Sequence, residues 1–257
     1  MNVINDIDYA STINQFFEGY FGEEEDADYY VFPRVTILHE FLEWVISIVI
    51  LERMRNIIEI TQDADACVYN DILGMHDQRG LTIIEEIMCR YDKKPIEFRK
   101  WWIDEYNNHV DEQIDGYELL NKYIESNQEI YDDSIEKLAV EIFYILFQNR
   151  EFLLWFNETV ACYNKKICNR RSLPEWVKRT IEYRDKGRCV FCGRDVVGTY
   201  ETQDDYLEHF DHIVPLAENG TNCVTNIQLT CCSCNEGKHT NSMTNDIYVN
   251  WYDKVEQ

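Results

Sequence analysis

The chain has 257 residues, of which 48 are acidic and 24 basic, so its formal net charge is −24. From Arg171 onward, nine basic and 14 acidic residues give −5, so the part before Arg171 carries −19. Such a charge argues against direct DNA binding by the first part, because DNA affinity comes largely from neutralised phosphates. The acidity is predicted to form a solvated face, a protein-docking surface or a shield against nucleic acid.

The composition also bears on the cellular compartment. The chain opens without a basic segment followed by an apolar one, so no signal peptide is expected. The most apolar run, residues 44–51, is too short to span a membrane. Ten cysteines are present, and we interpret those outside the motifs below as reduced thiols. These observations predict a cytoplasmic protein without membrane segments.

Apolar residues recur every three or four positions through most of the chain up to Cys168, which predicts helices. Pro95 suits the first turn of one of them, and glycine is scarce before Gly187. The expected fold is a multi-domain α+β chain: an all-α helical bundle over 1–168, and a second domain over 169–257. Residues 167–174 are the predicted linker, with a helix following at 174–183. The other helices are expected over residues 9–21, 35–61, 82–91, 117–124 and 133–165.

Two Cys-x-x-Cys pairs stand in the last quarter of the chain. Cys189 and Cys192 form the first, and Cys231 and Cys234 form the second, with the segment 193–230 between them. Two such pairs can hold one tetrahedral zinc ion. The long separation is explained if the zinc closes the base of a β-hairpin, although a zinc ribbon without catalysis has the same ligands. Cys232 lacks the two-residue gap to Cys234 and is expected to be a bystander.

An acidic residue and a histidine lie between the cysteine pairs, in a segment that alternates like a strand (residues 207–214). The two-residue period puts Asp211 and His212 on opposite faces, unless the strand bends near Pro215. A histidine titrates near neutrality and suits proton transfer. A carboxylate suits Mg²⁺ or Mn²⁺. His209 lies two residues before Asp211 and is a weaker candidate ligand.

Four motifs resemble those of the HNH endonucleases, the zinc-braced branch of the His-Me finger nucleases. They are Arg184 to Gly193, Asp211 to Leu216, Gly220-Thr221-Asn222 with Asn226 to Leu229, and Cys231-x-x-Cys234-Asn235-x-x-Lys238. The resemblance covers residues 171–240 and implies a ββα-metal domain with a structural zinc. Nothing similar is recognised in residues 1–170.

The resemblance also implies residue roles. His212 would be the general base. Asn226 would tie the loop between the two strands and help to orient His212. Asp211 and Asn235 would bind the catalytic Mg²⁺ or Mn²⁺, joined by His239 if a helix puts it on the face of Asn235. Lys238 would contact a DNA phosphate. Basic residues near the first cysteine pair are the other candidates for the DNA backbone: Lys178, Arg179, Arg184, Lys186, Arg188 and Arg194.

The sequence thus predicts a metal-dependent endonuclease that hydrolyses DNA phosphodiester bonds. The alternative is a non-catalytic zinc module that binds protein or nucleic acid. The acidic helical part is expected to dock a protein partner or to restrain the nuclease, so that a fragment beginning near Arg170 would bind DNA better at low salt. A nuclease domain joined to an unfamiliar acidic one favours a bacterial or phage-defence effector. Nothing in the sequence indicates a target sequence.

Overall fold

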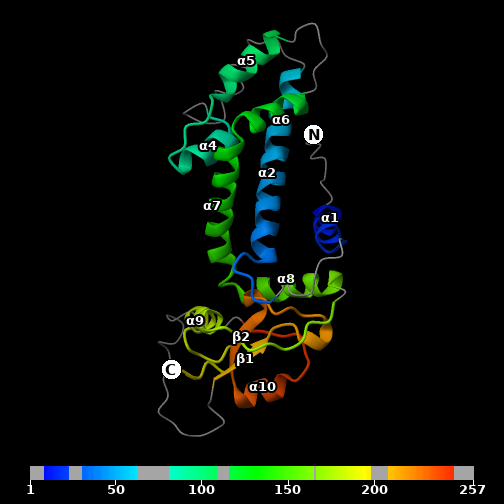
Figure 1. Ribbon diagram of the computed structural model, residues 1–257, viewed down its shortest axis with the longest axis vertical. Coiled ribbons are helices and arrows are strands. Elements are labelled where there is room, and N and C mark those ends of the chain that lie inside the picture. The colour runs from blue at the N-terminus through cyan, green and yellow to red at the C-terminus, as the bar shows by residue number, and fades with distance from the viewer. Residues whose placement is uncertain are drawn as a thin grey trace, which may run out of the picture. The chain divides into compact units, whose positions relative to one another are not determined.

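The computed structural model describes most of the chain, namely residues 9–22, 31–62, 81–108, 116–164, 166–197 and 208–245. The chain divides into two compact units: Met1–Leu38 together with Phe143–Gln257, and His39–Ile142. The described residues are mostly helical and contain one two-stranded sheet (Figure 1). None of the described helices is long and apolar enough to cross a membrane.

The unit His39–Ile142 consists of helices. The long helices α2 (Ile37–Gln62) and α7 (Gln128–Leu146) run side by side in it (Figure 1). The shorter helices are α4 (Ile83–Arg90), α5 (Phe98–Asn108) and α6 (Gly116–Ser126). Phe98 and Tyr123 are fully buried and meet edge to face, with ring centroids 4.8 Å apart. Burying aromatic surface of this size is a main source of folding free energy.

A buried carboxylate connects two helices of this unit. Glu85 closes a capping box at the start of α4, where its Oε2 accepts from Thr82 N and Thr82 Oγ1, both at 2.8 Å. Its Oε1 accepts from the backbone N–H of Phe98 at 2.9 Å. One side chain therefore satisfies the otherwise unpaired N–H groups at the beginnings of α4 and α5.

The other unit places two helices from the part before Cys168 with the C-terminal part. Helix α1 (Tyr9–Gly22) packs on α8 (Arg150–Tyr163), where the buried Phe17 lies 5.4 Å from the ring of Tyr163 and 6.0 Å from that of Phe156. Helix α8 is also hydrogen-bonded to the connection between the strands, because Asn157 Nδ2 donates to Thr225 O at 3.0 Å. Asn164, which caps the end of α8, donates through Nδ2 to Asn219 O at 2.9 Å.

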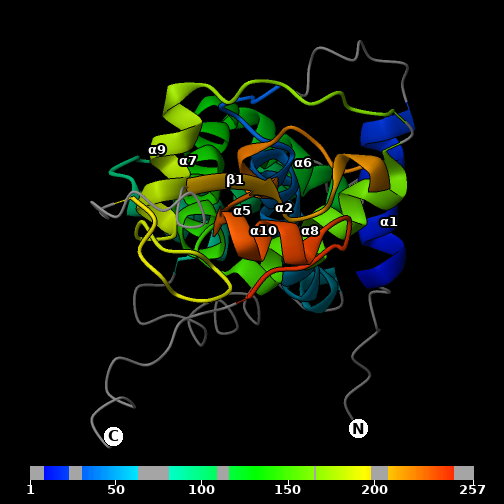
Figure 2. The same cartoon turned by 90° about the horizontal axis from the view of Figure 1, so that it is seen from below.

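The C-terminal part has two antiparallel strands followed by a helix. Strand β1 (Glu208–His212) pairs with β2 (Ile227–Cys231), with Asp211 opposite Gln228 and His212 opposite Ile227. Helix α10 (Cys232–Lys238) follows β2 directly and packs against both strands (Figure 2). Two short 3-10 turns, η3 (Leu216–Glu218) and η4 (Val224–Asn226), lie in the connection, and α9 (Glu175–Arg184) packs against β2.

A close backbone approach fixes the connection between the strands. The amide of Gly220 donates to Pro215 O at 3.0 Å, and a Cβ built on Gly220 would lie 2.1 Å from Val214 O. Only glycine fits this position without moving the backbone.

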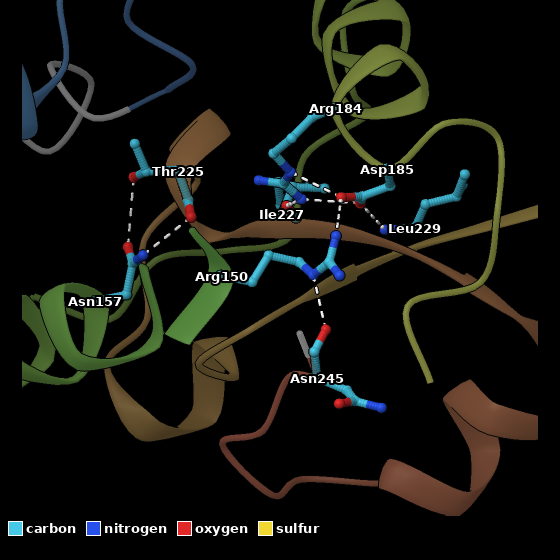
Figure 3. A network of polar contacts seen from close by, with 8 residues as sticks. All are labelled: Arg150, Asn157, Arg184, Asp185, Thr225, Ile227, Leu229 and Asn245. Atoms are coloured by element: carbon cyan, nitrogen blue, oxygen red, sulfur yellow. Dashed lines mark hydrogen bonds and ion pairs between the residues drawn. The ribbon is translucent and has the colours of Figure 1, made fainter. Parts of the chain in front are cut away.

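A buried ionic network joins α8, α9 and β2 (Figure 3). The Asp185 carboxylate accepts from Arg184 at 2.9 Å through both oxygens, from Arg150 Nη1 at 3.1 Å and from Leu229 N at 2.9 Å. Arg184 Nη2 also donates to Ile227 O at 2.6 Å, and Arg150 Nε to Asn245 O at 2.8 Å. The carboxylate is fully buried, so two guanidinium groups compensate its desolvation.

These contacts change the expected organisation. The single bundle expected over 1–168 is not confirmed: α1 and α8 lie in the unit of the C-terminal strands, and the other unit lies between them in the sequence. A fragment beginning near Arg170 would lose Arg150, Asn157 and Asn164, and with them the contacts of α8. It is therefore not a suitable test of restraint by the acidic part.

Two element boundaries also differ from the sequence prediction. Residues 133–165 form the end of α7 and all of α8, not one helix, because the Asn149 side chain accepts from Phe152 N and starts a new helix. Helix α5 begins at Phe98, three residues after Pro95. The first backbone N–H of this helix donates a hydrogen bond to the Glu85 carboxylate.

The Asp185→Asn variant tests the buried network. Removing the carboxylate charge leaves Arg150 and Arg184 buried without a counter-charge, and we expect the free energy of unfolding to fall by about 3–5 kcal/mol. Urea denaturation followed by circular dichroism measures the change. The control is Glu175→Gln, which removes the exposed partner of Arg179 and is expected to cost no more than about 1 kcal/mol. Equal effects of the two substitutions would contradict a central role for Asp185.

Candidate functional site

The four motif cysteines converge on one point. Cys189 and Cys192 lie on a turn, Cys231 ends β2 and caps α10, and Cys234 lies in the first turn of that helix. Their sulfur atoms all lie within 4.8 Å of one another, and those of Cys192 and Cys231 are 3.9 Å apart. Zinc–sulfur bonds of about 2.3 Å in a tetrahedron separate the sulfurs by about 3.8 Å. The arrangement fits a four-thiolate zinc site.

The backbone holds the first pair in place. Cys189 N donates to Arg194 O at 2.8 Å, Gly193 N donates to Cys189 O at 2.9 Å, and Gly193 has a φ of 71°, which favours glycine. Val190 N donates to Leu229 O at 2.9 Å, so the turn is attached to β2. Burial raises the pKa of the Cys189 thiol, and a cation among the sulfurs would favour the thiolate that metal binding needs.

His212 is the last residue of β1, and its ring is buried. Its Nε2 lies 3.2 Å from Asn222 Oδ1. The pKa of His212 lies below its ordinary value, first because the ring is desolvated. The Asn222 contact and the charge of Asp211 oppose this shift, while the charges of Arg170 and Lys238 add to it. The ring is therefore neutral at neutral pH, which is the form that accepts a proton.

Asp211 faces other neighbours, as the two-residue period predicts. Its Oδ2 accepts from Gln228 Nε2 and pairs with Lys238 Nζ, each at 3.0 Å. Its Oδ1 makes no hydrogen bond to the described residues, and the side chain keeps an exposed fraction of 14%. One oxygen of the carboxylate is thus open to a ligand.

A second oxygen without a hydrogen-bond partner belongs to Gln228, whose side chain contacts Asp211. Gln228 is fully buried, and its Nε2 donates to two acceptors, Asp211 Oδ2 and Met243 O, both at 3.0 Å. Its Oε1 consequently points elsewhere and has no hydrogen-bond partner among the described residues. A buried acceptor without a partner is rare and indicates a missing water or ion.

Asn235 lies on α10 three residues before Lys238, which reaches Asp211, so the two share a face of the helix. Asp211 and Asn235 offer the hard oxygen ligands that Mg²⁺ and Mn²⁺ prefer. The types of donor present therefore suit a divalent ion.

His239 does not share a helix face with Asn235. Helix α10 ends at Lys238, and His239 adopts a φ of 52° in the turn that follows, with an exposed side chain. The expected stacking of His239 over Asn235 required one continuous helix. His239 thus remains a candidate ligand without a shared helix face to support it.

Asn226 ties the loop together with its side chain. Its Oδ1 accepts from Val214 N at 2.8 Å, while Nδ2 donates to Val214 O at 2.9 Å and Thr221 O at 3.0 Å. The described contacts of the His212 ring come from Asn222 instead. The described contacts of Asn226 therefore hold the backbone of Ile213 and Val214, the two residues that follow His212.

Two of the expected DNA contacts are buried. Arg184 is committed to Asp185 and Ile227 O, with its guanidinium 4.9 Å from the Phe147 ring centroid. Lys238 donates to His212 O at 2.7 Å besides pairing with Asp211. Neither presents its charge to DNA. Lys186 and Arg188 are exposed near the first cysteine pair, as are Arg179 and Arg194, while Lys178 is partly exposed.

Two residues that act on His212 were not expected from the sequence. Asn222 stood inside the second motif without an assigned role, and Arg170 stood in the predicted linker. Arg170 is exposed and close enough to His212 to act on its pKa. Only the run Asn169-Arg170-Arg171 of polar and basic residues was a signal for it.

Comparisons with known proteins agree with the C-terminal motifs. Residues 189–241 match the sequence model of the family described as HNH endonuclease, which confirms the resemblance for this part of the chain. No curated protein and no solved structure matches the chain. Residues 189–241 are therefore similar to HNH domains, a similarity that suggests either nuclease activity or a zinc-binding module.

The Cys192→Ser variant tests the zinc site. We expect about one zinc per wild-type chain, and a loss of most of it in the variant, because a four-thiolate site depends on every ligand. Elemental analysis after dialysis measures the content. Cys232→Ser is the matched control: it removes the neighbouring thiol, which lies outside the cluster, and should retain full zinc. Full zinc in Cys192→Ser, or its loss in Cys232→Ser, would contradict the assignment.

Proposed function

We propose that the chain is a metal-dependent HNH endonuclease that hydrolyses DNA phosphodiester bonds. The observation that carries the proposal is the combination at the end of β1: a buried neutral histidine beside a carboxylate with an open oxygen, inside a segment that matches the HNH family. In this account the zinc at the four cysteines maintains the fold and takes no part in the reaction.

His212 supplies the proton chemistry in the proposed mechanism. Its neutral ring accepts a proton from a water molecule, and the resulting hydroxide attacks phosphorus. The nearby charge of Asp211 stabilises the imidazolium that forms. Because the ring is mostly buried, the proton transfer takes place at an edge with little competing solvent.

Asp211 and Asn235 would hold Mg²⁺ or Mn²⁺. Such an ion would supply positive charge to offset the charge that develops on the phosphate and on the departing oxygen. Lys238 keeps the Asp211 carboxylate in place from the opposite oxygen, and it also fixes the backbone of His212.

The DNA backbone has several candidate partners. Lys186 and Arg188 lie exposed beside the first cysteine pair, and the exposed Arg170 is close enough to His212 for its charge to help lower the pKa of that ring. We propose that Arg170 holds the phosphate near the general base, because no ion pair to a described residue occupies its charge.

The alternative is a zinc module without catalysis. It uses the same cysteines but assigns no function to the unpartnered oxygens of Asp211 and Gln228. Cleavage experiments separate the two proposals, since a zinc module binds without cutting.

The inserted unit His39–Ile142 holds 24 acidic and 10 basic residues, a net charge of −14. We propose that it docks a protein partner or limits DNA binding by electrostatic repulsion. The expected role as a bacterial or phage-defence effector rests on the sequence alone, and neither the family match nor the fold adds support for it.

The His212→Ala variant tests the mechanism. Loss of a positioned general base is expected to slow cleavage about 10²- to 10⁴-fold. Conversion of supercoiled plasmid to nicked circles measures it, with Mg²⁺ or Mn²⁺ and with EDTA. Zinc content and circular dichroism should match the wild type, which controls for folding. Asp211→Ala should instead require more divalent ion. Wild-type cleavage by His212→Ala would remove this residue from the mechanism, and absence of cleavage by the wild type in every ion would favour the zinc module.

The Arg170→Gln variant tests phosphate binding beside the base. We expect weaker binding to all DNA sequences alike, and a slope of log K against log salt that is shallower by about 0.9, the effect of one phosphate contact. Fluorescence anisotropy with labelled duplex DNA, in buffer without added Mg²⁺ or Mn²⁺ and without chelator, measures both. Arg90→Gln removes an equal charge from the other unit, where Arg90 pairs with Glu141, and should leave the slope unchanged. The same slope in all three proteins would contradict the contact.

A further inference from the structure

The side-chain amide of Asn222 lies between a backbone carbonyl and the ring of His212. Its Nδ2 donates to Asn169 O at 2.8 Å, and its Oδ1 lies 3.2 Å from His212 Nε2. The residue is almost fully buried, and its own carbonyl accepts from Phe32 N at 2.8 Å. Contacts on both sides of the amide and on its backbone fix the position of this side chain.

The partner on the far side determines which end of the amide faces the histidine. A backbone carbonyl oxygen only accepts hydrogen bonds, so the NH₂ group must face Asn169. The amide oxygen therefore faces His212. Because this oxygen also only accepts, the hydrogen between the two residues must belong to Nε2 of the ring.

A neutral imidazole carries one proton, so a proton on Nε2 leaves Nδ1 with a free electron pair. Nδ1 makes no hydrogen bond to the described residues. We propose that Asn222 is a positioning residue that holds His212 in the tautomer protonated on Nε2, which makes Nδ1 the nitrogen that accepts the proton from water. The inference deepens the proposed function and rests on it for the identity of the reaction.

In the proposed step an O–H bond of water breaks and Nδ1–H forms, while the water oxygen bonds to phosphorus. The bond from phosphorus to the departing oxygen breaks, and that oxygen keeps the electron pair and takes a proton from solvent. The ring becomes an imidazolium that donates from both nitrogens, and Asn222 Oδ1 continues to accept from Nε2. Solvent later removes the proton from Nδ1. A hydrogen bond on the second nitrogen is a general means of setting the orientation and basicity of a functional histidine.

The same contact gives a role to the segment between α8 and α9. Asn169 lies in residues 167–174, which the sequence predicted to be a linker. Its carbonyl orients Asn222, and the next residue, Arg170, lies near the same ring. This segment therefore belongs to the surroundings of the general base.

Nuclear magnetic resonance of the full chain labelled with ¹⁵N tests the tautomer directly. Two-bond ¹H–¹⁵N correlations of a histidine ring distinguish a proton on Nε2 from one on Nδ1, and His212→Ala identifies the signal. The spectra are recorded about two pH units above the ordinary histidine pKa of about 6.5, where the ring is neutral. We expect the wild type to be protonated on Nε2, and a proton on Nδ1 would overturn the inference without any variant.

Three variants separate positioning from folding. In Asn222→Leu, which has no acceptor, the two tautomers should mix and cleavage should slow about 10- to 100-fold. In Asn222→Asp, the acceptor is kept, so the Nε2 tautomer and most of the activity should return. Asn164→Leu removes another buried asparagine that donates to a loop carbonyl of the same unit, and it should leave the tautomer unchanged.

The outcomes distinguish the inference from the proposed function. A wild-type tautomer retained in folded Asn222→Leu, with full zinc, would overturn the inference even if the chain cuts DNA. A tautomer that depends on Asn222 in a chain that cuts no DNA would leave the positioning intact and reject the nuclease.

Discussion

The fold of the C-terminal part depends on one buried carboxylate. Asp185 accepts from Arg150 at the start of α8, from Arg184 at the end of α9 and from the backbone of Leu229 in β2. Burying a charge without partners is costly, and the pairs satisfy it only when all three elements meet. Strand β2 is thereby fixed in the middle, while the cysteine cluster fixes its end at Cys231. The two anchors differ in kind: one consists of buried ion pairs, and the other would need a bound zinc ion.

The candidate site is built outward from this fixed strand. Strand β1 pairs with β2 in a register that puts Asp211 opposite Gln228, whose buried amide holds the carboxylate from the side. Lys238 closes the arrangement from α10, because its ammonium group binds both the Asp211 side chain and the His212 carbonyl. The groups that would act on a phosphate therefore lie on one rigid end of β1, which is the requirement for precise positioning.

Local patterns carried the most information about the site. The two Cys-x-x-Cys pairs and the Asp211-His212 segment are short and contiguous, so spacing alone indicated their chemistry and the family match agrees with it. Roles that depend on long-range packing were not readable. Arg184 and Lys238 resemble surface cations in sequence, yet the fold buries both against carboxylates and backbone carbonyls of the C-terminal part. The membership of α8 in the C-terminal unit was also hidden, because amphipathic periodicity indicates an apolar face but not its partner.

The central claim is that one chain carries two chemically different metal sites, a closed thiolate site for zinc and an open oxygen site for the reacting ion. X-ray diffraction from crystals grown with Mn²⁺, recorded at the zinc and manganese absorption edges, tests it most directly. The account predicts zinc alone among Cys189, Cys192, Cys231 and Cys234, and a separate manganese peak bound to Asp211 Oδ1 and to the amide oxygen of Asn235. Manganese absent from Asp211, or zinc found there and missing from the cysteines, would contradict it.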